Sequence, residues 1–151
     1  MTIELAPMTA SDVPEVKRLE DQLFPVDAWS EELFHNELAE VGISREVMVA
    51  RSDKKIVGYV SLRVVGSEGD VVTIAVDPNF QKQGVGTLMM DWLEATATGL
   101  GVRELFLEVR SDNIPAIAMY LARDFERIDL RRNYYDTGVD AYVMRKRLSH
   151  V

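Results

Sequence analysis

Residues 74–87 read Ile74-Ala75-Val76-Asp77-Pro78-Asn79-Phe80-Gln81-Lys82-Gln83-Gly84-Val85-Gly86-Thr87, and this stretch decides the fold. Its apolar start predicts the end of a buried strand. A polar loop with the pattern Gln-x-x-Gly-x-Gly follows, and helical apolar periodicity begins directly after it. Such a junction directs several unpaired backbone N–H groups, at the positive end of the helix dipole, toward one point. The stretch therefore suits a pyrophosphate.

The glycine pattern alone leaves a second interpretation open. It lacks the Gly-x-x-x-x-Gly-Lys-Ser/Thr pattern of nucleoside-triphosphate loops, and it lacks the Gly-x-Gly-x-x-Gly pattern of dinucleotide sites. Two glycines near a helix start can also serve close packing. Residues outside this stretch are needed to distinguish a pyrophosphate site from close packing.

The bulk composition predicts one globular domain over residues 1–151. Of the 151 residues, 47% are hydrophobic, which fits a chain that buries a core. No apolar run reaches the length of a membrane span, and the start Met1-Thr2-Ile3-Glu4 is unlike a signal peptide. We expect a cytoplasmic protein that does not associate with membranes.

Cysteine and histidine are scarce, which narrows the possible chemistry. The chain has no cysteine, so disulfides, thiolate metal sites and a cysteine nucleophile are excluded. Its two histidines, His35 and His150, are interpreted as surface residues. We therefore expect neither a Ser-His-Asp triad nor a metal site.

The acidic charge is concentrated in the first third of the chain. Residues 1–46 hold eleven acidic and three basic residues, whereas residues 47–151 hold fourteen of each. One interpretation is a pair of well-solvated helices. The other is an acidic surface that attracts a cationic partner. Direct nucleic-acid binding is disfavoured, because it requires a basic surface.

The periodicities predict a mixed α/β sheet, classed as α+β in some schemes, flanked by helices. Two helices come first, from Thr9 to Phe24 and from Ser30 onward. Strands over 47–51, 55–65 and 71–76 follow, then the helix over 85–98, a strand over 104–109, a helix over 114–121 and strands over 125–130 and 141–147. Tight turns make the early strands antiparallel, while the helical connection makes 71–76 and 104–109 a parallel pair.

Further residues downstream match the glycine loop. Leu107-Glu108-Val109-Arg110 ends a strand, Asn113 follows in a turn, and Ala116-Ile117-Ala118-Met119-Tyr120 forms the next helix. Together with residues 74–87 they resemble the GNAT family of acetyl-CoA-dependent N-acetyltransferases. Trp29-Ser30 and Arg131-Arg132-Asn133-Tyr134-Tyr135 are similar to the bacterial ribosomal-protein-alanine acetyltransferases of that family. The resemblance covers nearly the whole chain and is strongest over residues 70–136.

The resemblance implies how acetyl-CoA is bound, without a metal. It implies that the strand with Ile74, Ala75 and Val76 splays from the strand with Glu108 and exposes backbone groups to the pantetheine arm. The Val76 amide would stabilise the oxyanion, and Asn113 would contact the arm. The pyrophosphate would bind the backbone amides of Lys82, Gln83, Gly84, Val85, Gly86 and Thr87.

Two side chains are candidates for acid–base catalysis. Strand alternation puts Glu108 opposite the face of Leu107 and Val109, so Glu108 is either a solvated partner of Arg110 or Arg103, or a general base. Tyr120 is either a core tyrosine or the acid that protonates the departing thiolate. The resemblance favours the catalytic role for both.

The resemblance also implies the acceptor, namely the N-terminal alanine of a small-subunit ribosomal protein. Lysine side chains, polyamines and other small amines remain alternative acceptors, and a non-catalytic CoA-binding sensor is a further alternative. Without cysteine, direct attack by the amine is the simplest course. Tyr134 and Tyr135 either line a peptide groove or plug the last strands.

One position departs from the family pattern. Asp124 precedes Phe125 where the family has glycine. We expect positive φ at Asp124, a small loss of stability and no loss of activity.

Overall fold

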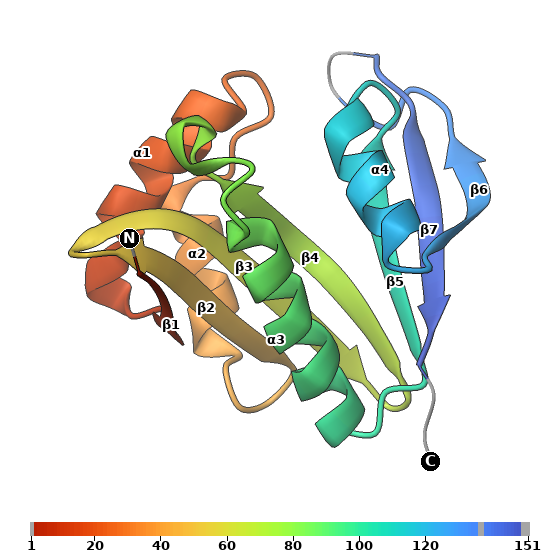
Figure 1. Cartoon of the computed structure of the whole chain (residues 1–151), viewed down its shortest axis with the longest axis horizontal. Helices are drawn as coiled ribbons and strands as arrows, with labels where there is room; N and C mark the ends of the chain where they lie inside the picture. The colour runs from red at the N-terminus through yellow and green to blue at the C-terminus, as the bar shows by residue number, and fades with distance from the viewer. Residues whose placement is uncertain (1, 136–137, 149–151) are drawn as a thin grey trace.

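The computed structural model describes residues 2–135 and 138–148 and contains one seven-stranded sheet (Figure 1). The strand order is β1-β2-β3-β4-β5-β7-β6. All neighbouring strands are antiparallel except β4 and β5, which are parallel. The strands are β1 (Ile3–Pro7), β2 (Arg45–Ser52), β3 (Lys55–Val65), β4 (Glu68–Val76), β5 (Glu104–Arg110), β6 (Glu126–Arg131) and β7 (Ala141–Arg147). The predicted mixed, mostly antiparallel sheet is confirmed.

Helices cover both faces of the sheet (Figure 1). They are the 3₁₀ turn η1 (Ala10–Asp12), α1 (Val13–Leu23), α2 (Glu31–Ala39), the 3₁₀ turn η2 (Pro78–Phe80), α3 (Val85–Gly99) and α4 (Ile114–Ala122). Ser30 caps α2, because its Oγ accepts a hydrogen bond from the Leu33 amide at 3.2 Å. The two predicted N-terminal helices are therefore present.

The strand β1 was not predicted from the sequence. This strand pairs with β2 from Ile3 opposite Ser52 to Pro7 opposite Met48. It is a short edge strand that ends in proline, and both features weaken a sequence signal. The partner strand, rather than a strong pattern of its own, determines its conformation.

Two apolar clusters hold the helices to the sheet. On the α3–α4 face, Leu93 and Tyr120 pack with residues of β3, β5 and β7, so this cluster reaches across both halves of the sheet. On the α1–α2 face, Val16 and Phe34 pack with residues of β1, β2, β3 and β4. The half-sheet formed by β5, β6 and β7 thus contributes no residue to the buried cluster on the α1–α2 face.

The parallel strands β4 and β5 are joined at one end and separate toward the other (Figure 1). Their pairing runs from Glu68 opposite Glu104 to Asp70 opposite Phe106. Parallel pairing was expected over residues 71–76, but the paired residues precede that segment. A register shift against β3 leaves Val72 as an extra residue in β4. Because a bulge bends its strand, β4 turns away from β5 here.

Candidate functional site

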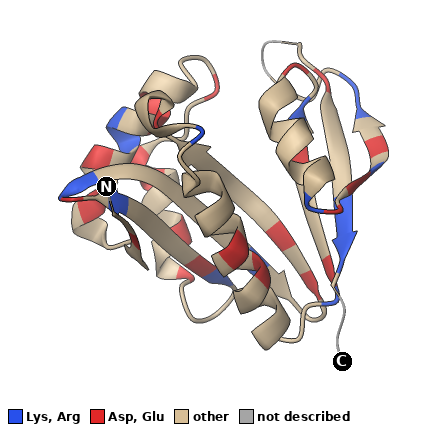
Figure 2. Cartoon of the chain, in the orientation of Figure 1, with Lys and Arg blue, Asp and Glu red and all other residues tan. Residues whose placement is uncertain are grey.

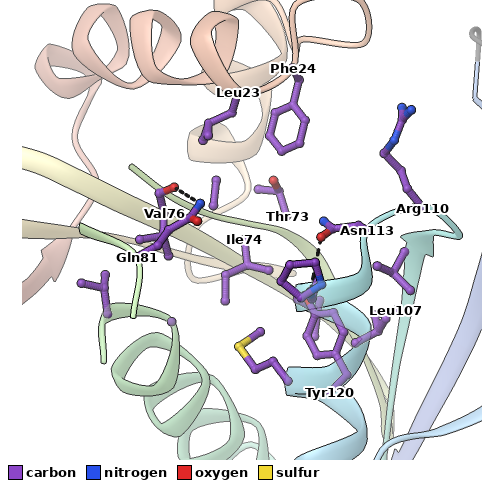
Figure 3. Close-up of a pocket in the computed structure, with 18 of the residues that line it drawn as sticks. Leu23, Phe24, Thr73, Ile74, Val76, Gln81, Leu107, Arg110, Asn113 and Tyr120 are labelled. Atoms are coloured by element: carbon purple, nitrogen blue, oxygen red, sulfur yellow. Dashed lines mark hydrogen bonds between the residues drawn. The ribbon is translucent and has the colours of Figure 1, made fainter. Parts of the chain in front are cut away.

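A cavity of about 730 Å³ fills the wedge between β4 and β5 (Figure 3). It is bounded by the end of α1, the edge of β4, the start of α3, the end of β5 and the start of α4. The predicted site residues that line it are Ile74, Ala75, Val76, Lys82, Gly84, Val85, Gly86, Thr87, Glu108, Asn113 and Tyr120. Gln83 is the one predicted residue outside this lining, and its side chain donates to the Asn79 carbonyl at 3.2 Å.

The edge of β4 presents backbone groups to the cavity. The Asp77 amide donates to the Val57 carbonyl at 2.8 Å, so the backbone of Asp77 faces β3. Because antiparallel pairing alternates, the N–H and C=O groups of Ile74 and Val76 face the opposite side, toward the wedge. There β5 is not paired with them. The backbone groups of Ala75 face β3, so Ala75 lines the cavity wall but does not direct its backbone N–H and C=O groups into the wedge.

The loop before α3 concentrates free backbone donors. Lys82 and Gly84 have φ angles of 63° and 84°, which turn the chain sharply at the helix start. In the described part of the chain, no acceptor is found for the backbone N–H groups of residues 82–87. Aligned donors at a helix N-terminus form a site for a phosphate group.

Close packing does not explain the two glycines of this loop. A Cβ atom at Gly84 would meet no atom within 4 Å, and Gly84 is instead required by its positive φ. A Cβ atom at Gly86 would lie 3.4 Å from the Met119 sulfur, which is ordinary contact. The protein therefore leaves room at Gly86 on the cavity side.

Asn113 begins α4 at the cavity wall. Its Oδ1 accepts a hydrogen bond from the Ala116 amide at 3.3 Å (Figure 3). The carboxamide oxygen is thus used to cap the helix, while its Nδ2 hydrogens remain available.

Glu108 lies where β5 has left β4, with 30% of its side chain exposed. Its neighbours Leu107 and Val109 are buried on the other face, as the alternation predicted. Arg131 Nη1 lies 3.5 Å from Glu108 Oε1, and the Glu108 carboxylate raises the pKa of the Tyr134 phenol above its ordinary value. Neither Arg110 nor Arg103 pairs with Glu108 among the described residues.

Tyr120 is both a core residue and a cavity residue. Its side chain is 4% exposed, and its ring meets that of Phe125 edge-on with centroids 5.6 Å apart. Its hydroxyl has no hydrogen-bond partner among residues 2–135 and 138–148. Burial, followed by the nearby Tyr135, raises the pKa of Tyr120 above its ordinary value, so the phenol stays protonated at neutral pH.

Tyr134 and Tyr135 lie together beside the end of β5. Their ring centroids are 5.1 Å apart, and Tyr135 lines the cavity. Burial, then the charge of Glu108, raises the pKa of Tyr135 to about 12. Tyr135 thus forms part of the wall, whereas Tyr134 is 46% exposed.

Residues of α1 and of the segment after it also line the cavity, although the sequence did not predict them as site residues. Glu20, Leu23, Asp27 and Trp29 all line the cavity. Glu20 is 3% exposed, accepts from the Trp29 amide at 2.9 Å and accepts from the Tyr59 hydroxyl. Burial raises the pKa of Glu20. The burial of Glu20 could have been predicted, because Glu20 follows the buried Val16 by one helical turn and so lies on the same face of α1.

Two further observations concern metals and membranes. Among residues 2–135 and 138–148, no group of three His, Asp or Glu side chains is arranged to hold a metal ion. No helix in the described ranges is long and apolar enough to cross a membrane. His35 is exposed, and His150 lies outside the described residues.

Comparison with known proteins links this geometry to one family. Residues 13–125 match the model of the acetyltransferase (GNAT) family. The N-alpha-acetyltransferase RimI of Mycobacterium tuberculosis is 38% identical over 95% of this chain and 92% of its own length. The [ribosomal protein bS18]-alanine N-acetyltransferase of Salmonella typhimurium is 32% identical over 91% and 92%.

A solved structure extends the likeness to three dimensions. The crystal structure of the ribosomal-protein-S18-alanine N-acetyltransferase from Escherichia coli superposes with a TM-score of 0.87. It is 30% identical in sequence, and the match covers 99% of this chain and 96% of that one. The separated β4–β5 pair, the donor-rich loop and the family match agree, and the chain belongs to the GNAT family as an acetyl-CoA-dependent N-acyltransferase.

Proposed function

We propose that this enzyme acetylates the N-terminal α-amine of a protein, and that its acceptor is the N-terminal alanine of a small-subunit ribosomal protein. The observation that carries the proposal is the placement of Glu108 and Tyr120 in one cavity between β4 and β5. The names of the relatives from Mycobacterium tuberculosis and Salmonella typhimurium point to the same acceptor class.

Acetyl-CoA would bind to the backbone of the wedge. The amides of Lys82, Gln83, Gly84, Val85, Gly86 and Thr87 would hold its pyrophosphate, for which they have no competing acceptor in the described chain. The pantetheine arm would pair with the exposed backbone of Ile74 beside Ala75, and with Val76 once its carbonyl gives up the hydrogen bond that it accepts from Gln81 Nε2 at 3.4 Å. Asn113 would contact the same arm through Nδ2.

Glu108 would accept the proton of the incoming amine. An α-amine has a pKa of roughly 7.7–8.0, so most of it is protonated at neutral pH and cannot attack. A partly exposed carboxylate in the cavity, near Arg131 and Tyr134, can receive this proton directly or through a water molecule.

Tyr120 would supply the proton that the leaving group needs. The neutral amine nitrogen forms a bond with the thioester carbonyl carbon, the C–S bond breaks, and the sulfur takes a proton from the phenol. The resulting phenolate then takes the second proton, which the new amide nitrogen loses. Because burial keeps the Tyr120 phenol protonated at neutral pH, the phenol carries the proton that this step requires. The Val76 amide would stabilise the negative charge on the carbonyl oxygen during attack.

A basic acceptor suits the charge of the α1–α2 side. Acidic residues lie on both α1 and α2, while Lys and Arg are prominent on β7 (Figure 2). The cavity is bounded by Glu20, Asp27 and Trp29 on this side. Attraction would guide a cationic protein N-terminus toward the cavity, and ribosomal protein tails are basic. Such an acceptor would place the reaction in the cytoplasm.

A matched set of acceptors tests the proposal. The purified enzyme and acetyl-CoA are incubated with a basic peptide that begins with alanine, the same peptide with a blocked N-terminus, an acidic version of the peptide, and a polyamine. Mass spectrometry then maps the modified nitrogen. We expect acetylation of the alanine α-amine, weaker use of the acidic version and no product from the blocked peptide. Acetylation of only the polyamine, or of lysines in the blocked peptide, would refute the proposed acceptor.

A further inference from the structure

Arg110 binds two separate segments at the end of β5, where the wedge is open. Its Nη1 donates to Asp27 Oδ2 at 2.6 Å, and its Nε donates to Asp112 Oδ1 at 3.1 Å. Its guanidinium carbon lies 5.1 Å from the centre of the Tyr135 ring. The Arg110 side chain is 24% exposed and lines the cavity (Figure 3).

The contact joins parts of the molecule that are otherwise unconnected on this face. Asp27 belongs to the segment between α1 and α2, and Tyr135 follows β6. The buried cluster of the α1–α2 face includes no residue of β5, β6 or β7. Within the described residues, Arg110–Asp27 is the only side-chain hydrogen bond or ion pair between residues 2–44 and 104–148.

The charges of this contact persist across neutral pH. An arginine guanidinium does not lose its proton in a protein. Arg110 also holds the pKa of Asp112 below its ordinary value, chiefly through their hydrogen bond. A guanidinium that lies over a ring and donates to two carboxylates uses its flat geometry fully, which a lysine cannot do.

We propose that Arg110 is a positioning residue for the acceptor: it holds Asp27 and Tyr135 at the two sides of the acceptor opening and so sets its width. The inference rests on the proposed function only in that the acceptor enters on the α1–α2 side. The donor loop of residues 82–87 and the edge of β4 contain no partner of Arg110. Arg110 should therefore influence the binding of the acceptor and not that of acetyl-CoA.

Steady-state kinetics on five variants test this role: Arg110→Gln, Arg110→Lys, Asp27→Asn, the Arg110→Gln/Asp27→Asn double variant and Arg145→Gln. Arg145 is a matched control, because it is also 24% exposed and pairs with two carboxylates, Glu126 and Glu104, but lines no part of the cavity. We expect Arg110→Gln to raise the acceptor KM by about tenfold, the size expected for a charge-assisted hydrogen bond. The KM for acetyl-CoA should stay within about twofold, and Arg145→Gln should leave both unchanged.

The double variant tests whether Arg110 acts through Asp27. If Arg110 acts through Asp27, the double variant should be no worse than Arg110→Gln, because contacting residues are non-additive. Arg110→Lys should fall between wild type and Arg110→Gln. Equal increases in both KM values, full additivity, or an equal effect of Arg145→Gln would overturn the role. The kinetics use whichever amine the enzyme acetylates, so failure of the ribosomal acceptor would be seen separately.

Discussion

The two sides of the wedge differ in the groups that line them: backbone groups on one side and side chains on the other. The side proposed to bind acetyl-CoA is made of backbone, namely the free edge of β4 and the unpaired amides of residues 82–87. The side proposed to bind the acceptor is made of side chains from three distant segments, among them Asp27, Arg110 and Tyr135. A backbone site tolerates sequence change as long as its conformation is kept, whereas a side-chain site changes with single substitutions. The acceptor side is therefore where enzymes of this fold can diverge.

The largest effect is expected where the two sides meet. Tyr120→Phe keeps the ring and its contact with Phe125 but removes the hydroxyl, so turnover should fall by about 10²-fold. Glu108→Gln should lower turnover by a similar factor. Calorimetry should show acetyl-CoA binding within about twofold of wild type in both. If both variants turn over at the wild-type rate, the acid–base assignment is wrong.

A methyl group at Gly86 tests the backbone side alone. The protein has room for it, since the nearest atom would be 3.4 Å away, but the methyl would enter the cavity. Gly86→Ala should raise the KM for acetyl-CoA by about tenfold and should leave the acceptor KM unchanged. Because alanine favours helix, stability should rise by about 0.5 kcal/mol.

Gly99→Ala is the matched control on the same helix. A Cβ atom at Gly99 would meet nothing within 4 Å, and Gly99 lies at the other end of α3, away from the cavity. Thermal unfolding should show a similar gain in stability, while the KM for acetyl-CoA stays at the wild-type value. If the Gly86→Ala and Gly99→Ala variants have the same KM for acetyl-CoA, acetyl-CoA does not occupy the space beside Gly86.

Glu20 provides a pH test of the acceptor side. Burial, the largest cause, raises the pKa of Glu20 from its ordinary 4.5. The folded protein then retains a proton that the unfolded chain releases near pH 4.5, so this residue costs stability as the pH rises from there through the folded pKa. Above the folded pKa the cost is constant.

Glu20→Gln keeps an oxygen that can accept from the Trp29 amide but has no charge to bury. Denaturant unfolding from pH 4 to 8 should show the variant gaining relative to wild type as the pH rises, then levelling off. A stability difference that does not change with pH would contradict this account. The acceptor KM should change little, because the contact with Trp29 is retained.

The smallest effect is expected outside the wedge, at Asp124. Its φ of 72° confirms the positive value expected from the sequence. A left-handed residue with a side chain is strained, so Asp124→Gly should raise stability by about 0.5 kcal/mol after the entropy of glycine is subtracted. Asp53, with φ of 56° in the β2–β3 turn, is a control for which the same gain is expected. A change in either KM for Asp124→Gly would show that Asp124 acts on the site.

The residues proposed to bind acetyl-CoA could be predicted from local sequence patterns. Those on the proposed acceptor side could not, because they meet only through long-range contacts. The junction at Gly84 is recognisable because its strand, turn and helix are contiguous, and Glu108 because strand alternation is local. Asp27 and Arg110 are 83 residues apart, and no periodicity relates them. The strand β1 was missed for the same reason, since its conformation depends on β2.

The short pairing of β4 with β5 has a consequence for how ligand binding protects backbone amides from hydrogen exchange. In the described chain, strand pairing joins the two half-sheets over the segments 68–70 and 104–106, and the Arg103 and Glu104 amides donate to the Ser67 carbonyl beside them. A molecule that hydrogen-bonds along the free edge of β4 would take the place of the pairs that are missing beyond Asp70. Amide hydrogen exchange at Ile74 and Val76 should then be fast in the free enzyme and slow when acetyl-CoA is bound. On this view the substrate itself completes the sheet.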